Sequence, residues 1–340
     1  MAVAYVANIA GSNVNGGNWT ASGLPAGTAA GDLVLAVIAG RGNVNVIANT
    51  ANGWIAVHNQ WATAETSTVA NTGHGGLTVA YFKYEGVAPD LVFYRTGGDA
   101  GRGVLCTLRG VNFTASVGNS SIRDNANTAA PYSAAITAGP SNFLVGCMGA
   151  GNDNALGSGA ANCATDPVAA SWTNRHNAVT TTGADTSIGV SSATKNTAGG
   201  DTGQFNFPAS YAGLHVISFV EFVAAVAPTA PTSLTVTVFS DAKMNLAWTA
   251  AANGGQAVTG YRIERESPVG GGWSNRVANT GTTTTSYQDT GLTASTQYNY
   301  RISAINRVPL LGAASTALAN TTLMGGVGVL TGAQMGFPYC

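Results

Sequence analysis

The chain has 340 residues, of which 9% are charged and 45% hydrophobic, and its formal net charge is −1. This balance excludes the basic footprint of a nucleic-acid-binding protein, the hydrophobic share excludes a disordered chain, and no apolar run reaches the roughly 18 residues that a membrane span needs. An average soluble domain carries about 25% charged residues, so Gly, Ala, Thr, Asn and Ser must cover most of this surface. The length predicts two or three domains, and the composition is typical of an all-β protein with many turns.

The clearest strand signal near the N-terminus is Gly31–Gly40 (GDLVLAVIAG), which holds seven apolar residues in a row. A short apolar run that is flanked by glycines and lacks a helix cap predicts a strand buried on both faces. Ser141–Met148 (SNFLVGCM) has the same character 110 residues later, and it too follows a turn-like segment.

Three further landmarks recur in the same order along the chain. Gly53-Trp54 with His58 recurs as Ser171-Trp172 with His176 at an offset of 118, and two strand-like runs, 77–84 and 103–109, recur as 187–194 and 213–219 at an offset of 110. Such order indicates an internal duplication, although a chain rich in Ala, Gly, Val and Thr also aligns with itself by chance. We predict that residues 1–222 form one jelly-roll-like β-sandwich of two pseudo-repeated halves, with 31–38 and 142–148 as equivalent central strands.

The spacing of the four cysteines fits neither a zinc site nor a CxxC redox motif; they are Cys106, Cys147, Cys163 and Cys340. Cys106 and Cys147 lie inside apolar strand runs, so we expect both to be buried free thiols that are not metal ligands. No catalytic or cofactor-binding motif is present, and we therefore expect neither an enzyme nor a cofactor.

Histidines are potential metal ligands, and tryptophans are potential platforms for stacking against sugars. His58 and His176 occupy equivalent positions in the two halves, which favours a structural role. Trp54 and Trp172 also recur, which favours packing over ligand stacking. Trp61, placed in a polar loop, is then the remaining candidate for contact with a glycan.

Residues 223–233 (VAAVAPTAPTS) predict a domain boundary, because two prolines among small residues give a short, extended linker. The following domain, 234–322, alternates polar and apolar residues in a series of expected strands: 234–238, 244–248, 258–266, 286–292 and 296–306.

The stretch of about 228–322 resembles a fibronectin type III domain. The residues that carry the resemblance are two opening prolines, two core aromatics and a Leu followed six residues later by a Tyr: Pro228, Pro231, Trp248, Tyr261, Leu292 and Tyr298. The resemblance implies a sandwich whose core holds Trp248 and Tyr261. It also implies a tyrosine corner, in which the Tyr298 hydroxyl forms a hydrogen bond with nearby backbone.

The last segment, 323–340, is apolar, rich in glycine and without a charged residue. A sandwich of this class that is complete by Thr322 has no unfilled core for eighteen more residues. We therefore predict that the segment is an assembly tail that contacts another subunit. Its expected interface residues are Leu323, Val327, Val329, Leu330, Phe337, Tyr339 and Cys340.

The N-terminal unit resembles the jelly-roll or sandwich modules of bacteriophage virion structural proteins, through the strand that opens at Gly31-Asp32 and the ending Leu108–Val111. The resemblance implies a non-enzymatic virion protein, either a capsid decoration or a fibre-like appendage, whose partners are other copies of itself and other virion proteins. Met1–Tyr5 lacks the basic and apolar regions of a secretion signal, as expected for a protein assembled into virions in the host cytoplasm.

The alternative is a carbohydrate-binding adhesin module of a phage tail or a bacterial surface, with host-surface glycans as partners. Glycan affinity of the isolated protein would favour the adhesin, and a defined place in a symmetric particle would favour the virion protein. Head or tail location and the symmetry of the assembly stay open at this stage.

Overall fold

A computed structural model of the chain describes residues 3–10, 18–41, 45–47, 53–61, 75–96, 101–128, 142–150, 173–179, 187–194 and 213–325. These residues form 21 β-strands, which confirms the predicted all-β class. The chain divides into two units, 1–226 and 227–340, and this division falls inside the predicted linker 223–233. Among the described residues, no helix is long and apolar enough to cross a membrane.

The first half of the N-terminal unit forms one antiparallel sheet of five strands. Their order across this first sheet is β1 (Ala4–Ala10), β8 (Gly101–Arg109), β3 (Leu33–Arg41), β6 (Gly75–Lys83) and β5 (Ile55–Trp61). The second half forms a second sheet with the order β9 (Val117–Thr128), β13 (Gly213–Phe222), β10 (Phe143–Ala150), β12 (Ser187–Thr194) and β11 (Thr173–Val179). In chain order the two halves place corresponding strands at corresponding positions, so the predicted duplication is present in the sheet topology.

Strand registers locate the duplication residue by residue. A bulge in β5 falls between Ala56 and His58, and a bulge in β11 falls between Asn174 and His176, 118 residues later. His58 lies opposite Val79, and His176 lies opposite Val190. The predicted equivalence of the two histidines is therefore confirmed by a shared backbone irregularity.

The predicted alignment of the closing strands is wrong by four residues. Val37 of β3 lies opposite Val104, whereas its counterpart Cys147 lies opposite Ser218, so β8 and β13 correspond at an offset of 114 rather than 110. The counterpart of Cys106 is consequently Val220 and not Val216. A shift of four keeps every side chain on its original face, because strand side chains alternate with a period of two. Apolar pattern alone could not separate the two alignments.

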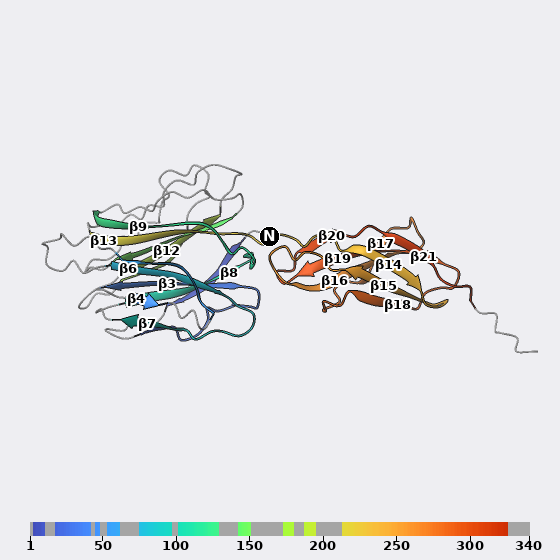
Figure 1. Ribbon diagram of the computed structural model, residues 1–340, viewed down its shortest axis with the longest axis horizontal. Helices are drawn as coiled ribbons and strands as arrows, with labels where there is room; N and C mark the ends of the chain where they lie inside the picture. Colours follow the sequence, from blue (N-terminus) through green and yellow to red (C-terminus); the bar gives the residue numbers. More distant parts are fainter. Residues whose placement is uncertain are drawn as a thin grey trace, which may run out of the picture. The chain divides into compact units, whose positions relative to one another are not determined.

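The two sheets face each other across the main core of the unit. Their inward residues are almost completely buried; in β3 and β10 they are Leu33, Leu35, Val37, Ala39, Phe143, Val145 and Cys147. Figure 1 shows the sheet that contains β9, β13 and β12 lying over the sheet that contains β6, β3 and β8. The predicted sandwich is therefore built with each half supplying one whole sheet.

A third, small sheet covers the outer face of the first one. It consists of β2 (Trp19–Thr20), β7 (Val92–Thr96) and β4 (Asn45–Ile47), and Figure 1 shows β4 and β7 beyond β3. The outward side chains of β3, Val34, Ala36 and Ile38, pack in one cluster with Trp19, Trp54 and Phe93. This third layer explains why β3 is buried on both faces, as its sequence predicted.

The C-terminal unit is a sandwich of two further antiparallel sheets. One contains β14 (Thr232–Val238), β15 (Lys243–Thr249) and β18 (Ser286–Thr290). The other contains β17 (Trp273–Val277), β16 (Val258–Glu266), β19 (Gln297–Asn306) and β20 (Leu311–Ala314), with β21 (Leu318–Thr321) also paired to β19. The five strands predicted here are present with ends shifted by at most two residues, while β17, β20 and β21 had not been predicted.

Candidate functional site

Polar side chains in the N-terminal unit lie where the two large sheets meet. His58 Nδ1, on the edge strand β5, is 2.7 Å from Ser218 Oγ on β13 of the opposite sheet. Burial lowers the pKa of His58 to about 4. The imidazole is therefore neutral near pH 7 and serves as a hydrogen-bonding link between the sheets.

The equivalent edge strand of the second sheet forms the matching contact. Burial, followed by the charge of Arg102, lowers the pKa of His176. The neighbouring Arg175 places its guanidinium 4.4 Å from the ring centre of Tyr5 on β1 and donates from Nε to Ser192 Oγ at 2.8 Å. Asn8 of β1 donates to the Arg175 carbonyl oxygen at 2.7 Å. Both histidines thus lie in strands at sheet-to-sheet contacts, in line with the structural role that the sequence favoured.

Cys106 and Cys147 are buried and free, as predicted. Burial raises the pKa of the Cys106 thiol to about 12 and raises that of Cys147 well above its ordinary value. Thiols with such pKa values are unreactive near neutral pH. Within the part of the chain that the structure describes, no group of three His, Cys, Asp or Glu side chains is placed to hold a metal ion. Cys163 and Cys340 lie outside the described residues.

Each half closes the corner at the start of its central strand with a polar pair. In the first half, Asp32 accepts two hydrogen bonds from Arg109, each 2.8 Å long. In the second half, Asn142 stands at the position of Asp32 and donates to Glu221 at 2.6 Å. Asn142 keeps the place of Asp32, but Glu221 does not keep that of Arg109, because it corresponds to Thr107 at the offset of 114. Both polar pairs nevertheless link the start of a central strand to the end of the closing strand beside it.

The predicted core residues of the C-terminal unit come together as expected. The rings of Trp248 and Tyr261 meet edge to face with their centres 5.1 Å apart. Leu292 and Tyr298 are buried, and the backbone N–H of Thr293 donates to the Tyr298 hydroxyl at 2.8 Å. This bond is the tyrosine corner that the resemblance implied.

A buried carboxylate, which sequence reasoning missed, links four strands of the same unit. Asp289 of β18 is fully buried and lies 2.8 Å from Arg265 Nη1 of β16 and 2.5 Å from Arg276 Nε of β17. Tyr300 of β19 donates to the same carboxylate at 2.9 Å. Burial, and then the charge of Asp289, raises the pKa of the Tyr300 hydroxyl, which stays protonated. Nothing in the local sequence around Asp289 signals this contact between the two sheets.

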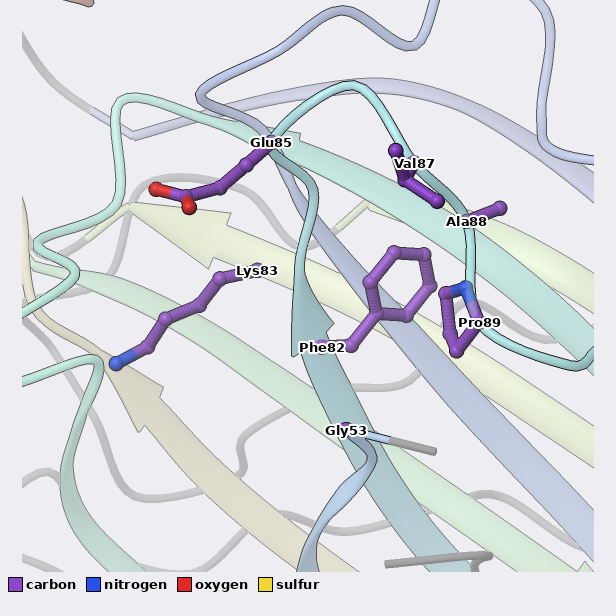
Figure 2. Close-up of a pocket in the computed structure, with 7 residues that line it drawn as sticks. All are labelled: Gly53, Phe82, Lys83, Glu85, Val87, Ala88 and Pro89. Carbon is purple, nitrogen blue, oxygen red and sulfur yellow. The ribbon is translucent and has the colours of Figure 1, made fainter. Parts of the chain in front are cut away.

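The surface of the N-terminal unit carries a shallow depression of about 450 Å³ above the end of β6. Figure 2 shows the Phe82 ring beside Pro89, with Val87 and Ala88 on the turn above and Lys83 and Glu85 extending to the other side. Val87 is 84% exposed. The seven lining residues include Lys83 and Glu85 but no histidine, serine or cysteine.

The remaining predicted site residues are only partly described. Trp61 is the last residue of β5, so its backbone lies in a strand and not in the loop that we expected, and its side chain lies outside the described part. In the tail, Leu323 is 55% exposed. The other predicted interface residues lie outside the described residues; they are Val327, Val329, Leu330, Phe337, Tyr339 and Cys340.

Comparison with known families identifies part of the chain. The family model described as "Fibronectin type III domain" matches residues 229–314, the same stretch that folds into the sandwich with the tyrosine corner. Residues 229–314 form a fibronectin type III domain. No family assignment covers the β-rich N-terminal unit.

Two curated bacterial proteins share similarity with the chain over a length close to that of one such domain. Chitinase D of Niallia circulans is 40% identical over 92 residues, which cover 27% of this chain and 16% of that protein. Exoglucanase B of Cellulomonas fimi is 41% identical over 91 residues, which cover 26% of this chain and 7% of that protein. The chain therefore spans less than a fifth of the length of either relative.

Two solved structures that are similar to part of the chain are named as Fn3-like or fibronectin type III. An Fn3-like protein from Clostridium thermocellum shares 27% identity and covers 30% of this chain and 99% of its own, with a TM-score of 0.23. The sixth fibronectin type III domain of the human fibronectin type III domain containing protein 3 shares 26% identity and covers 30% of this chain and 92% of its own, with a TM-score of 0.26.

Proposed function

We propose that the chain is a non-enzymatic structural protein of a bacteriophage virion, a capsid decoration or a fibre-like appendage, which acts by subunit packing and display. The observation that carries the proposal is how the fibronectin domain ends. Thr322 Oγ1 donates to the Thr293 carbonyl oxygen at 2.7 Å and accepts from the Thr296 N–H at 3.0 Å. Immediately afterwards Met324 is 82% exposed, and residues 326–340 carry no charged side chain.

An apolar segment that leaves a finished domain is an element for contact with a partner, because large apolar side chains gain free energy when they leave water. The placement of charged groups in the two sandwiches also supports a structural role. Asp32, Glu264 and Asp289 are all bound to arginines within their own unit, where they stabilise the fold.

Immunogold electron microscopy tests the proposal. An antibody raised against the whole chain is applied to virus particles purified from cultures that produce it, with particles from a deletion strain as control. We expect gold at one repeated position on the particle. The proposal would be contradicted if the protein were detected only in the particle-free lysate or in the medium of unlysed cells.

A carbohydrate-binding adhesin module is the second candidate. The observation that favours it is a segment of about 90 residues that is 40% and 41% identical to parts of two proteins named as a chitinase and an exoglucanase. The test is co-sedimentation of the whole chain with insoluble chitin and cellulose, alongside a Trp61→Ala variant. If the chain binds a polymer and Trp61→Ala abolishes this binding, the result supports the adhesin. If the chain binds neither polymer and no glycan on a host-cell glycan array, the result counts against the adhesin.

A further inference from the structure

An uncharged groove runs along one edge of the fibronectin domain. It has a volume of about 380 Å³ and lies between the start of β14 and the junction of β20 with β21. Its walls are made mostly of small and apolar residues, none of them charged: Ala230, Pro231, Thr232, Ser233, Leu234, Ala314, Ser315, Thr316, Ala317 and Leu318.

Two backbone irregularities open this groove. In β14 the pairing with β15 shifts between Thr232 and Thr235, and Ser233 has a φ of 53°, which is rare for a residue other than glycine. Across the groove, residues 315–317 interrupt the edge between β20 and β21. Further along, the two edges meet again, because the Asn320 side chain donates to the Val236 carbonyl oxygen at 2.8 Å. The opening is therefore local.

The groove presents apolar surface to solvent. Leu318 is 40% exposed, and Ala317 beside it is exposed as well. Backbone strain such as that at Ser233 persists only where the surrounding structure imposes it, and an observed outlier is a reason to look for function. An occupant that suits these walls is an uncharged, extended segment with small residues and a few apolar side chains.

The chain itself contains such a segment in residues 326–340. This tail has no charged residue, and four glycines are interleaved with its apolar side chains, which lets its backbone approach a surface closely. Extended at about 3.3 Å per residue, it reaches about 50 Å. It is long enough to reach a neighbouring subunit.

The direction of β21 favours a groove on another copy. Leu318 lines the groove and is the first residue of β21, so the strand leads away from it. At the far end the Leu323 carbonyl oxygen accepts from the Ser295 N–H at 3.0 Å. A tail entering its own groove must therefore reverse direction, whereas a tail entering a second copy continues outward.

We propose that the tail 326–340 of one copy binds in the β14/β20–β21 groove of a second copy. This inference rests on the proposed function, since it names the receptor for subunit packing. Repetition of the same contact links subunits head to tail, which gives a ring if the rotation closes and a filament if it does not.

Disulfide trapping between two differently tagged full-length chains tests the inference. The receptor chain carries Thr316→Cys and Cys340→Ser, the donor chain keeps Cys340, and both carry Cys163→Ser. After mild oxidation with copper phenanthroline, we expect a disulfide-linked heterodimer on a non-reducing gel. The matched control receptor carries Ala319→Cys, an exposed position in the adjoining strand β21 that does not line the groove.

The outcomes separate the alternatives. No heterodimer, or equal linkage of the Ala319→Cys control, overturns the inference. A single chain that carries both Thr316→Cys and Cys340 tests binding of the tail to its own groove. If this chain forms an internal disulfide while the two-chain mixture gives no heterodimer, the tail binds its own groove and the inference is overturned. Ala317→Glu should weaken self-association at least about tenfold in sedimentation velocity, because a charge would then face an apolar partner.

Failure here is distinguishable from failure of the proposed function. If trapping fails but the chain is found at a repeated position on virus particles, the groove is not the receptor and the virion function stands. If trapping succeeds but particles lack the chain, the tail contact stands and the virion function falls.

Discussion

At the scale of single residues, the duplicated histidines show how one position can keep its place while its partners change. His58 bonds to a serine of the opposite sheet, whereas His176 lies near Arg102. The sequence predicted that the two positions are equivalent, because the spacing of Trp and His recurs. It could not identify the partners, since those lie on strands far away in the sequence; Ser218, for example, is 160 residues from His58.

Acid should destabilise the N-terminal unit through His58. Its pKa is about 4 in the folded chain and 6.5 in an unfolded chain, so the folded state favours the neutral imidazole more strongly than the unfolded state does. The resulting stability is fully present above pH 6.5 and is lost as the pH falls from 6.5 to about 4. The shift corresponds to about 3 kcal/mol at most, and to less here because the ring is only partly buried. His58→Gln should remove this part of the pH dependence.

Calorimetry of the whole chain between pH 7 and pH 4 measures this effect. Because the carboxyl groups of both proteins titrate alike, the informative quantity is the difference between wild type and His58→Gln. The transition of the fibronectin domain is the internal reference and should not differ between them. An unchanged pH profile of the N-terminal transition would show that His58 is not held neutral.

At the scale of elements, the sequence predicted strands well wherever apolar residues run together or alternate. The central strand β3 was found because both of its faces are buried, so it reads as one apolar run. β17 was missed because its three middle residues, Ser274–Arg276, are all exposed and give no alternation. The four-residue error between β8 and β13 had a different cause, since registers that differ by an even number present the same faces.

The contact between β8 and β2 gives a sharp test of the third layer. A Cβ atom on Gly103 of β8 would overlap the indole of Trp19 on β2. Gly103→Ala should therefore destabilise the N-terminal unit by roughly 1–3 kcal/mol through overpacking, measured by urea unfolding. The double variant Gly103→Ala/Trp19→Phe should recover part of the lost stability, because the phenyl ring is smaller than the indole.

Gly23→Ala is the matched control for this test, because no heavy atom lies within 4 Å of the Cβ position at Gly23. It should change stability little. A Gly103→Ala protein as stable as the control would mean that Trp19 does not pack against β8 as described.

The Asp289 network makes a prediction for the fibronectin domain. Asp289→Asn leaves Arg265 and Arg276 without their buried counter-charge, which should cost roughly 2–4 kcal/mol; the cost is below that of a fully buried pair because both arginines can regain water. The side chains of these arginines are 26% and 35% exposed, respectively. Glu264→Gln, which breaks the more exposed pair with Arg301, should cost no more than about 1 kcal/mol. Equal costs in urea unfolding would refute the special role of Asp289.

At the scale of the whole molecule, the few charged residues have a structural role in the β-sandwiches. The ion pairs among the described residues join strands or strand ends within one unit, so these charges stabilise the packing of strands. The sequence predicted the two sandwiches because each has its own apolar pattern. It could not predict the third sheet, since β2 and β4 are only two and three residues long, or the groove, which depends on the conformation of Ser233.

Removing the tail separates folding from assembly. A chain ending at Gly325 keeps the hydrogen bonds of Thr322 and Leu323 to the turn before β19, so both units should unfold at the same urea concentration as in the full chain. The large apolar side chains beyond Gly325 are lost, each worth roughly 1.5–3 kcal/mol when fully buried. The truncated chain should therefore be a soluble monomer that no longer joins particles. A full-length chain carrying Val269→Thr, a change at an exposed residue of the fibronectin unit that lies outside both the groove lining and the tail segment, is the control and should still assemble. Normal incorporation of the truncated chain, or its unfolding, would show that the tail is not an assembly element.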